Sequence, residues 1–187
     1  MTKMVCISGS ARDGNTVGIA DIYVKDFQER GWETSKIYLD RISINSCTGC
    51  LSCDDTQTCI FDDRDDMKDY INAILESDII IMGTPARWGL LSGNLKVFID
   101  RLNPQAAVEG YTNKKIFVYA VGQSTAENPE SVNNALNSIL IFARDAGMEI
   151  IGTNLFLGLL NEKEYLDKYD EYSKICKIDV DNMLLRA

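Results

Sequence analysis

The amino-acid sequence predicts an α/β domain in which helices cover both faces of a parallel sheet. Along the 187 residues, strand-like segments alternate five times with segments of helical periodicity, which is the pattern of folds with a parallel sheet. Residues 78–83 (DIIIMG) are almost wholly apolar, as expected for a strand that is buried on both faces. Hydrophobic residues make up 45% of the chain, which is enough for a sizeable core.

Five strands are expected. The first covers residues 3–8 (KMVCIS), a short apolar run that ends in a glycine-rich turn. The others are expected at residues 33–39, 78–83, 115–121 and 148–154. Five such strands fit the flavodoxin-like order 2-1-3-4-5 in a three-layer α/β/α sandwich, although the sequence does not fix the order. Folds of this kind bind ligands beyond the carboxyl ends of the strands, at the switch point between the first and third strands.

Helices are expected between the strands, where apolar residues recur at helical spacing. Their expected ranges are residues 16–30, 65–76, 95–102, 130–146 and 162–185, the last as one helix or a pair. Residues 45–63 form the one long stretch without clear periodicity, and such loops are usually functional. We therefore expect one domain over residues 1–187, with a cysteine-rich insertion and a helical tail.

The charge of the chain argues against several classes of partner. Its formal net charge is −9, whereas binding to nucleic acid or to an anionic membrane surface needs a basic face. No apolar run approaches the ~18 residues of a spanning helix, and we expect no signal peptide, because the chain starts almost directly with a strand. We therefore expect a cytoplasmic protein that binds neither nucleic acid nor membrane, in a compartment that disfavours disulfides.

Histidine is absent from the chain, which excludes mechanisms that need an imidazole base. Its absence also excludes zinc sites that mix cysteine and histidine ligands. Hydride transfer suits such a sequence, because a cofactor carries the chemistry and the protein mainly orients it. We therefore expect a cofactor to do the chemistry, with no catalytic side chain.

The loop after the first strand (SGSARDGNT, residues 8–16) has the composition of a phosphate site. The free N–H groups and the dipole of the next helix favour an anion there. Ser10, Asn15 and Thr16 can add hydrogen-bond donors, and Arg12 adds a positive charge. Alternatively, Asn15 or Thr16 only caps the helix. The loop contains neither G-x-G-x-x-G nor a P-loop GK[ST].

Four cysteines follow one another with the spacing C-x2-C-x2-C-x5-C: Cys47, Cys50, Cys53 and Cys59. The first three match the compact run of bacterial [4Fe–4S] ligands. Zinc is an alternative, although four-cysteine zinc sites more often pair two C-x2-C motifs across a longer gap. Reversible disulfides or a redox sensor, and cysteines that simply stay reduced, are further alternatives. Two more cysteines, Cys6 and Cys176, are expected to be inert, the first as a small buried side chain.

Several segments resemble the NAD(P)H-dependent FMN reductase family, which has a flavodoxin-like fold. GSARDGNT resembles the family's phosphate loop GSPR-x-GNT, and TPARWG (residues 84–89) resembles its second loop. GNLKVFIDR (residues 93–101) resembles the helix that carries the motif KxFxDR. The cysteine run and the following Asp62 and Asp63 resemble the iron–sulfur flavoprotein branch of the family. Recognisable motifs extend from about residue 3 to 124, and the tail beyond residue 154 has none.

The resemblance implies that the chain binds FMN, with NAD(P)H as the expected donor and a [4Fe–4S] cluster at the four cysteines. The implied FMN contacts are Ser8, Ser10, Arg12, Asn15, Thr16, Thr84, Pro85, Ala86, Arg87, Trp88 and Gly89. The family also implies a homodimer or homotetramer with the flavin near a subunit interface, for which Leu90 and Leu91 would be suited. Two features depart from the family: Arg87 stands where an apolar or aromatic residue is common, and the third loop, residues 122–125, lacks the usual glycine-rich run.

The second loop has its own physical interpretation. Pro85 ends the preceding strand, because proline cannot donate to a sheet ladder. Trp88 offers a large flat surface suited to the edge or face of a ring, or is merely partly buried. Arg87 could stabilise negative charge on a reduced flavin, could reach a nicotinamide phosphate, or could simply be solvated.

Together these observations predict an FMN-dependent oxidoreductase. Electrons would pass from a nicotinamide nucleotide or a redox-protein donor through FMN to a small-molecule or protein acceptor. The cysteines would form an electron outlet beside the flavin, on the same edge of the sheet. The alternatives are a non-enzymatic FMN/Fe–S electron carrier and a cysteine-based redox or metal sensor.

Overall fold

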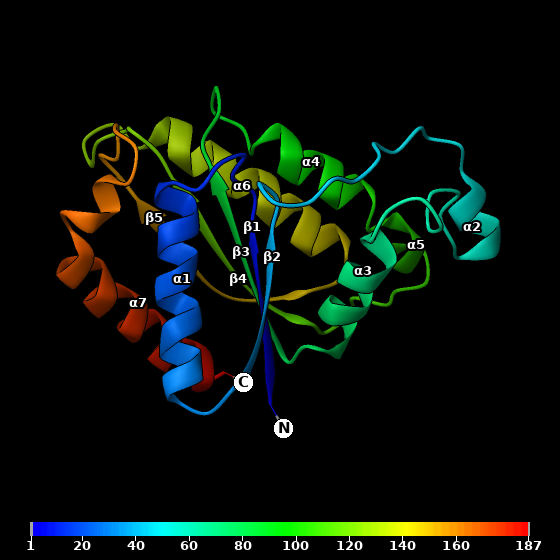
Figure 1. Ribbon diagram of the computed structural model, residues 1–187, viewed down its shortest axis with the longest axis horizontal. Helices are drawn as coiled ribbons and strands as arrows, with labels where there is room; N and C mark the ends of the chain where they lie inside the picture. Colours follow the sequence, from blue (N-terminus) through cyan, green and yellow to red (C-terminus); the bar gives the residue numbers. More distant parts are fainter. Residues whose placement is uncertain (1, 187) are drawn as a thin grey trace.

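The computed structural model describes residues 2–186 and is built on a five-stranded sheet (Figure 1). The strands are β1 (Lys3–Ser8), β2 (Glu33–Tyr38), β3 (Ile79–Pro85), β4 (Lys115–Val121) and β5 (Glu149–Phe156). Their order is β2-β1-β3-β4-β5, and each pair of neighbours is parallel. The predicted α/β/α fold class and the strand order are therefore confirmed.

Helices cover both faces of the sheet and enclose two apolar cores (Figure 1). One face packs against α1 (Asn15–Glu29) and α7 (Tyr169–Leu184). The other packs against α3 (Met67–Glu76), α4 (Gly93–Asp100) and α6 (Glu130–Asp145). The short elements α2 (Ser52–Thr56), α5 (Asn103–Ala106) and the 3-10 turn η1 (Glu164–Leu166) lie outside these layers. Both faces of the central strands are thus buried, which explains their uniformly apolar sequences.

Several helix boundaries differ from those predicted, for identifiable reasons. The helix expected at residues 95–102 begins two residues earlier, because the Ser92 hydroxyl accepts a hydrogen bond from the Leu95 N–H and caps it. The helix expected at residues 65–76 begins at Met67, whose N–H is bonded to the Asp65 carboxylate. The tail expected over residues 162–185 is split into η1 and α7.

The C-terminal helix is anchored to the rest of the molecule through Asp179. Its Oδ2 atom accepts hydrogen bonds from Tyr23 Oη on α1 at 2.6 Å and from Asn154 Nδ2 on β5 at 2.7 Å. Burial raises the pKa of this carboxyl, although the two donors oppose the shift. The tail, which has no recognisable motif, is therefore part of the packed structure.

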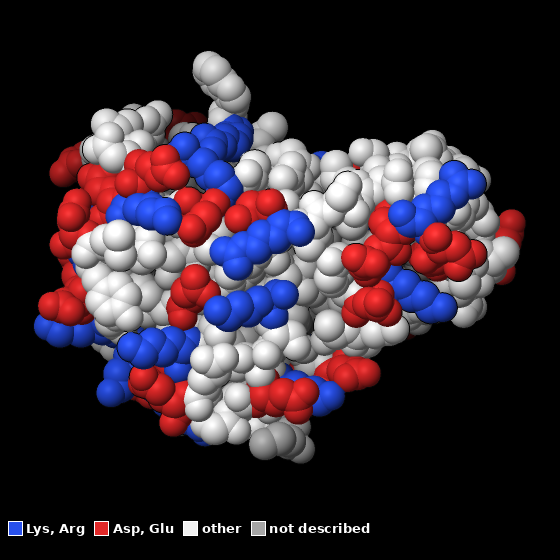
Figure 2. All heavy atoms as spheres, viewed as in Figure 1, with Lys and Arg blue, Asp and Glu red and all other residues white. Residues whose placement is uncertain are grey.

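The surface carries charges of both signs. Figure 2 shows acidic and basic side chains interspersed over one face, without a continuous basic area there. In the part of the chain that the structure describes, no helix is both long enough and apolar enough to cross a membrane.

A close approach between β3 and β4 sets the position of α1. A Cβ atom on Gly83 would lie 1.9 Å from the Tyr119 ring, so only glycine fits beside that ring. The Tyr119 side chain is fully buried, and its hydroxyl donates a 2.9 Å hydrogen bond to the carbonyl of Thr16 in the first turn of α1. Gly83 therefore leaves room for the tyrosine that holds the start of the first helix.

We expect Gly83→Ala to destabilise the protein by about 1–3 kcal/mol, because the new methyl group overpacks the core against Tyr119. The measurement is urea-induced unfolding followed by circular dichroism. Gly93→Ala is the matched control: nothing lies within 4 Å of its added Cβ, so its stability should stay within about 0.5 kcal/mol or rise. Equal stability of the two variants would contradict this account.

Candidate functional site

A cavity of about 390 Å³, called the flavin cavity below after the cofactor expected from the sequence, opens at the carboxyl ends of β1, β3 and β4. This is the edge of the sheet where folds of this topology bind ligands. Its walls come from the first loop, the second loop, the loop after β4, the start of α6 and the loop after β5. The lining residues are Ser10, Arg12, Gly14, Asn15, Thr16, Pro85, Ala86, Arg87, Trp88, Val121, Gly122, Gln123, Ser124, Ser131, Val132, Leu159, Leu160 and Asn161.

Ser92 joins the first two loops of the flavin cavity. Its hydroxyl donates to the carbonyl of Gly9 in the first loop, and its N–H donates to Thr84 Oγ1 at 3.0 Å in the second. The N–H of Gly9 in turn donates to the carbonyl of Gly83 at 2.8 Å. Ser92 and Thr84 are both buried, so water does not compete for these bonds and the two loops are held in a fixed relative position.

The start of α1 leaves its N–H groups open toward the flavin cavity. The N-cap residue is Gly14, and no side chain caps the helix. The alternative in which Asn15 or Thr16 merely caps this helix is therefore wrong. An uncapped helix start beside Ser10 and Arg12 suits an anionic group such as a phosphate.

The side chain of Asn15 is held by the segment after β5. Its Nδ2 donates to the carbonyl of Asn161 at 2.7 Å, and its Oδ1 accepts from the N–H of Tyr165 at 3.0 Å. Arg12 lies 3.8 Å from Glu162 in the same segment. Asn15 therefore links the first loop to the tail, a role that no sequence motif indicated.

The second loop forms a tight turn with Trp88 at its tip. Arg87 and Leu90 exchange two backbone hydrogen bonds, of 2.9 and 3.0 Å, and the two residues between them have φ of +52° and +72°. Positive φ at a tryptophan is unusual and suggests a functional constraint. The Trp88 side chain is fully exposed, so the alternative in which it is merely partly buried is wrong, and the turn projects from the sheet edge (Figure 1).

The predicted FMN contacts divide into two groups. Those that line the flavin cavity are Ser10, Arg12, Asn15, Thr16, Pro85, Ala86, Arg87 and Trp88, whereas Ser8, Thr84 and Gly89 do not. Ser8 is fully buried, and its Oγ has no hydrogen-bond partner among residues 2–186. The prediction omitted the third loop and the Leu159–Asn161 stretch. The family resemblance pointed to the third loop, but its lack of the usual glycine-rich run kept its residues out of the prediction, and the tail carried no signal of this kind.

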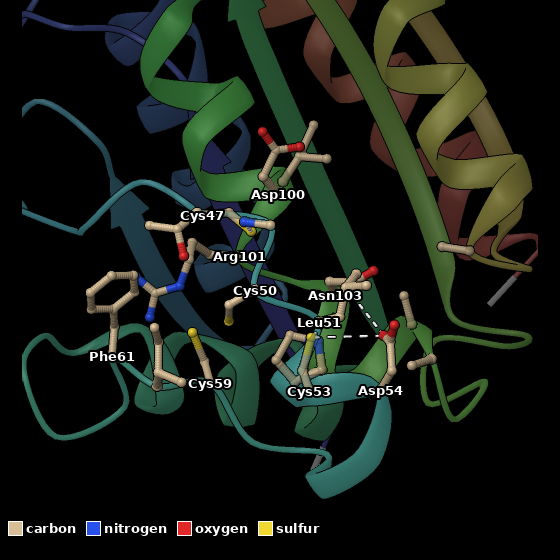
Figure 3. A pocket seen from close by; sticks show the side chains of 18 of the residues that line it. Cys47, Cys50, Leu51, Cys53, Asp54, Cys59, Phe61, Asp100, Arg101 and Asn103 are labelled. Carbon is tan, nitrogen blue, oxygen red and sulfur yellow. Dashed lines mark hydrogen bonds between the residues drawn. The ribbon is translucent and has the colours of Figure 1, made fainter.

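The four cysteines line a second cavity of about 740 Å³, the cysteine cavity below (Figure 3). It lies between the insertion and the ends of α4, α5 and α6. All four thiols are free, and Cys47 and Cys50 are exposed. Cys6 and Cys176 are buried in the sheet and in α7, where burial raises the pKa of each thiol above its usual range, as expected for inert cysteines.

The cysteines are not arranged around a single ion. Among residues 2–186, no three cysteine or acidic side chains form a group that could hold one metal ion. Tetrahedral zinc needs four sulfurs about 2.3 Å from one centre, so this arrangement does not suit zinc. A [4Fe–4S] cluster binds each cysteine sulfur to a different iron and needs them around a wider hollow. The four thiols, which line one cavity without meeting at one point, are therefore a donor set suited to a cluster and not to a single ion.

A buried ion pair fixes the cysteine segment to the core. Arg101 donates from Nη1 and Nη2 to the two carboxylate oxygens of Asp65, at 2.7 and 3.0 Å, and from Nη1 to the carbonyl of Asn45 at 2.8 Å. Both charged side chains are at most 2% exposed. Burial by itself would raise the pKa of Asp65, but hydrogen bonds from Arg101 and Asn45 hold it below its usual range.

The two cavities are separate within one chain. They share no lining residue, and they lie at opposite ends of α6: Val132 borders the flavin cavity, whereas Phe142 borders the cysteine cavity. Ten helical residues correspond to about 15 Å. The expectation that the cysteines lie directly beside the flavin does not hold within a single chain.

Comparison with known proteins gives consistent matches. The sequence profile described as NADPH-dependent FMN reductase matches residues 2–157. An iron–sulfur flavoprotein of Archaeoglobus fulgidus is 34% identical over 143 residues, which are 74% of this chain and 62% of that protein. Another, from Methanocaldococcus jannaschii, is 31% identical over 81% of this chain and 77% of its own length. The chain thus spans about three fifths of the length of the first of these relatives.

A solved structure supports the fold at lower sequence identity. The structure of an NADH:FMN oxidoreductase in its apo form superposes with a TM-score of 0.72 at 21% identity, covering 100% of this chain and 90% of that one. At this identity the match establishes the shared fold.

We expect Asp65→Asn to lower the stability by about 3–5 kcal/mol, because it leaves the Arg101 charge buried without a countercharge. The pKa of Asp65 is lowered by folding, so its contribution is complete above about pH 4 and declines as the pH falls through the folded-state pKa. Urea unfolding between about pH 2 and pH 7 tests both points, because most of the decline is expected below pH 4. The exposed Asp55→Asn is the control, and a loss independent of pH would contradict the ion-pair explanation.

Proposed function

Because this chain belongs to the NADPH-dependent FMN reductase family, in its iron–sulfur flavoprotein branch, we propose that it is an FMN-dependent oxidoreductase. Its donor would be NADH or NADPH, and its acceptor a quinone, free flavin, a nitro- or metal-containing compound, or a protein. The observation that most supports this is the flavin cavity at the switch point of the sheet, beside an uncapped helix start. When bound, FMN would supply the chemistry, taking up a hydride and passing electrons on.

The residues around the flavin cavity would bind and orient the cofactor. Arg12, Ser10 and the free N–H groups of α1 would hold the phosphate. Pro85 to Trp88 would lie along the ring, and Arg87 would supply positive charge near it. Ser92 would hold the first and second loops in a fixed relative position through its bonds to Gly9 and Thr84.

We further propose that Cys47, Cys50, Cys53 and Cys59 hold a [4Fe–4S] cluster. Two observations support this: the four free thiols line one cavity, and relatives matched over most of this chain are named iron–sulfur flavoproteins. The cluster would let electrons leave singly, whereas the flavin alone can pass them in pairs.

We also propose that the chain forms a homodimer or homotetramer. Trp88 and Leu90 are exposed beside the flavin cavity, and large exposed apolar side chains next to a site often mark an interface. A second subunit over this turn would shield the ring from water.

We expect Arg12→Gln to weaken FMN binding about tenfold, because it removes one charge-assisted hydrogen bond to the phosphate. Binding of riboflavin, which has no phosphate, should be unchanged. Flavin fluorescence quenching measures both affinities, and Lys25→Gln, an exposed change on α1, is the control. Equal loss for the two ligands would argue against a phosphate contact.

The oxidoreductase proposal is tested by mixing FMN-loaded protein with NADH or NADPH without oxygen. We expect at least one of them to bleach the flavin absorption near 450 nm. If neither does, the electron-carrier alternative gains support. If the protein binds no FMN at all, a cysteine-based sensor becomes the better explanation.

The cluster proposal is tested by iron and sulfide analysis of protein prepared without oxygen. We expect about four irons and four sulfides per chain, as for a cubane on four cysteines. Cys50→Ser should lose most of the iron. Bound zinc, or no metal, would overturn the cluster proposal and leave the flavin proposal intact.

A further inference from the structure

We propose that Arg101 and Asn103 donate N–H···S hydrogen bonds to the cysteine sulfurs and thereby raise the reduction potential of the cluster. The inference rests on the proposed function, since it concerns the cluster at these cysteines. Arg101 directly follows α4 and Asn103 is the first residue of α5, and both line the cysteine cavity. They act on the ligands and are not ligands themselves.

Asn103 already contacts a cysteine sulfur. Its Nδ2 atom lies 3.2 Å from Cys53 Sγ and 3.5 Å from Asp54 Oδ1. The carboxylate fixes the orientation of the amide, because an ionised carboxylate only accepts hydrogen bonds and must face the NH₂ group. Asn103 therefore presents its donor side to Cys53 (Figure 3).

The Nε–H group of Arg101 has no hydrogen-bond partner among the described residues. Its Nη1 and Nη2 atoms bind Asp65 and Asn45, and its guanidinium lies over the Phe61 ring at 5.3 Å. The Nε atom itself is buried. Leaving a buried donor unpaired costs about 1–3 kcal/mol, so such an atom indicates a group that binds there.

The guanidinium of Arg101 lies beside Cys59. Figure 3 shows the guanidinium between the Phe61 ring and the Cys59 side chain. Burial alone would lower the pKa of Arg101, but Asp65 and Cys59 outweigh it and raise the pKa. The backbone N–H of Cys59 donates to Asp62 Oδ2 at 3.0 Å, so this N–H is not free to donate to a sulfur.

Both N–H···S bonds would shift the reduction potential of the cluster to more positive values. Reduction adds negative charge to the cluster and its sulfurs, so N–H donors stabilise the reduced form more than the oxidised form. The carboxylates nearby, such as Asp54, act in the opposite direction. The potential would therefore depend on how many N–H···S bonds the protein supplies.

The experiment compares Asn103→Ala and Arg101→Lys with the wild type, all reconstituted with iron and sulfide without oxygen. The midpoint potential of the cluster is measured by spectroelectrochemistry. Asn103 is exposed, so its variant should fold normally, and Arg101→Lys keeps the positive charge but removes Nε. Asn137→Ala, an exposed change on α6, is the matched control, and thermal unfolding of each apoprotein monitors the fold.

We expect each substitution to lower the ratio of reduced to oxidised cluster at a fixed potential by about two- to tenfold, since one net hydrogen bond is worth about 0.5–1.5 kcal/mol. A tenfold change corresponds to a shift of about 59 mV to more negative potential. If Asn103→Ala is iron-loaded but has the wild-type potential, the inference is wrong and the cluster proposal stands. If the wild type holds no iron, the cluster proposal fails and the inference fails with it.

Discussion

The irregular cysteine segment is held in place by one buried guanidinium. Arg101 binds Asn45 just before the cysteines and Asp65 just after them, so both ends of the segment are fixed to the end of α4. A buried charge is tolerated only with a partner and satisfied hydrogen bonds. The fold of the insertion therefore depends on this ion pair rather than on an apolar core of its own.

Helix α4 connects the two cavities of the molecule. At its N-terminal end, Ser92 holds the first and second loops together around the flavin cavity. Just beyond its C-terminal end, Arg101 and Asn103 border the cysteine cavity. The segment GNLKVFIDR (residues 93–101) thus runs from the serine that joins the loops of the flavin cavity to the arginine that borders the cysteine cavity. A change in this helix would therefore affect both cavities.

Much of the candidate site could be predicted because it lies on loops that directly follow strands. Arg12 and Thr16 follow β1, Arg87 follows β3, and all three line the flavin cavity. The contacts that the tail makes with the first loop could not be predicted in this way. Asn161 and Tyr165 hold the side chain of Asn15, yet nearly 150 residues separate them in the sequence, and no local pattern reports such a contact.

The sequence by itself predicted the strands, the helices and most residues of both candidate sites. Periodicity and apolar runs reflect burial, which is a local property of each strand and helix, and cysteine spacing reflects the chemistry of the ligands. Tertiary structure alone decided how side chains are placed: the exposure of Trp88, the buried Nε of Arg101 without a hydrogen-bond partner, and the separation of the two cavities. These depend on how distant segments pack, and a single sequence contains no record of that packing.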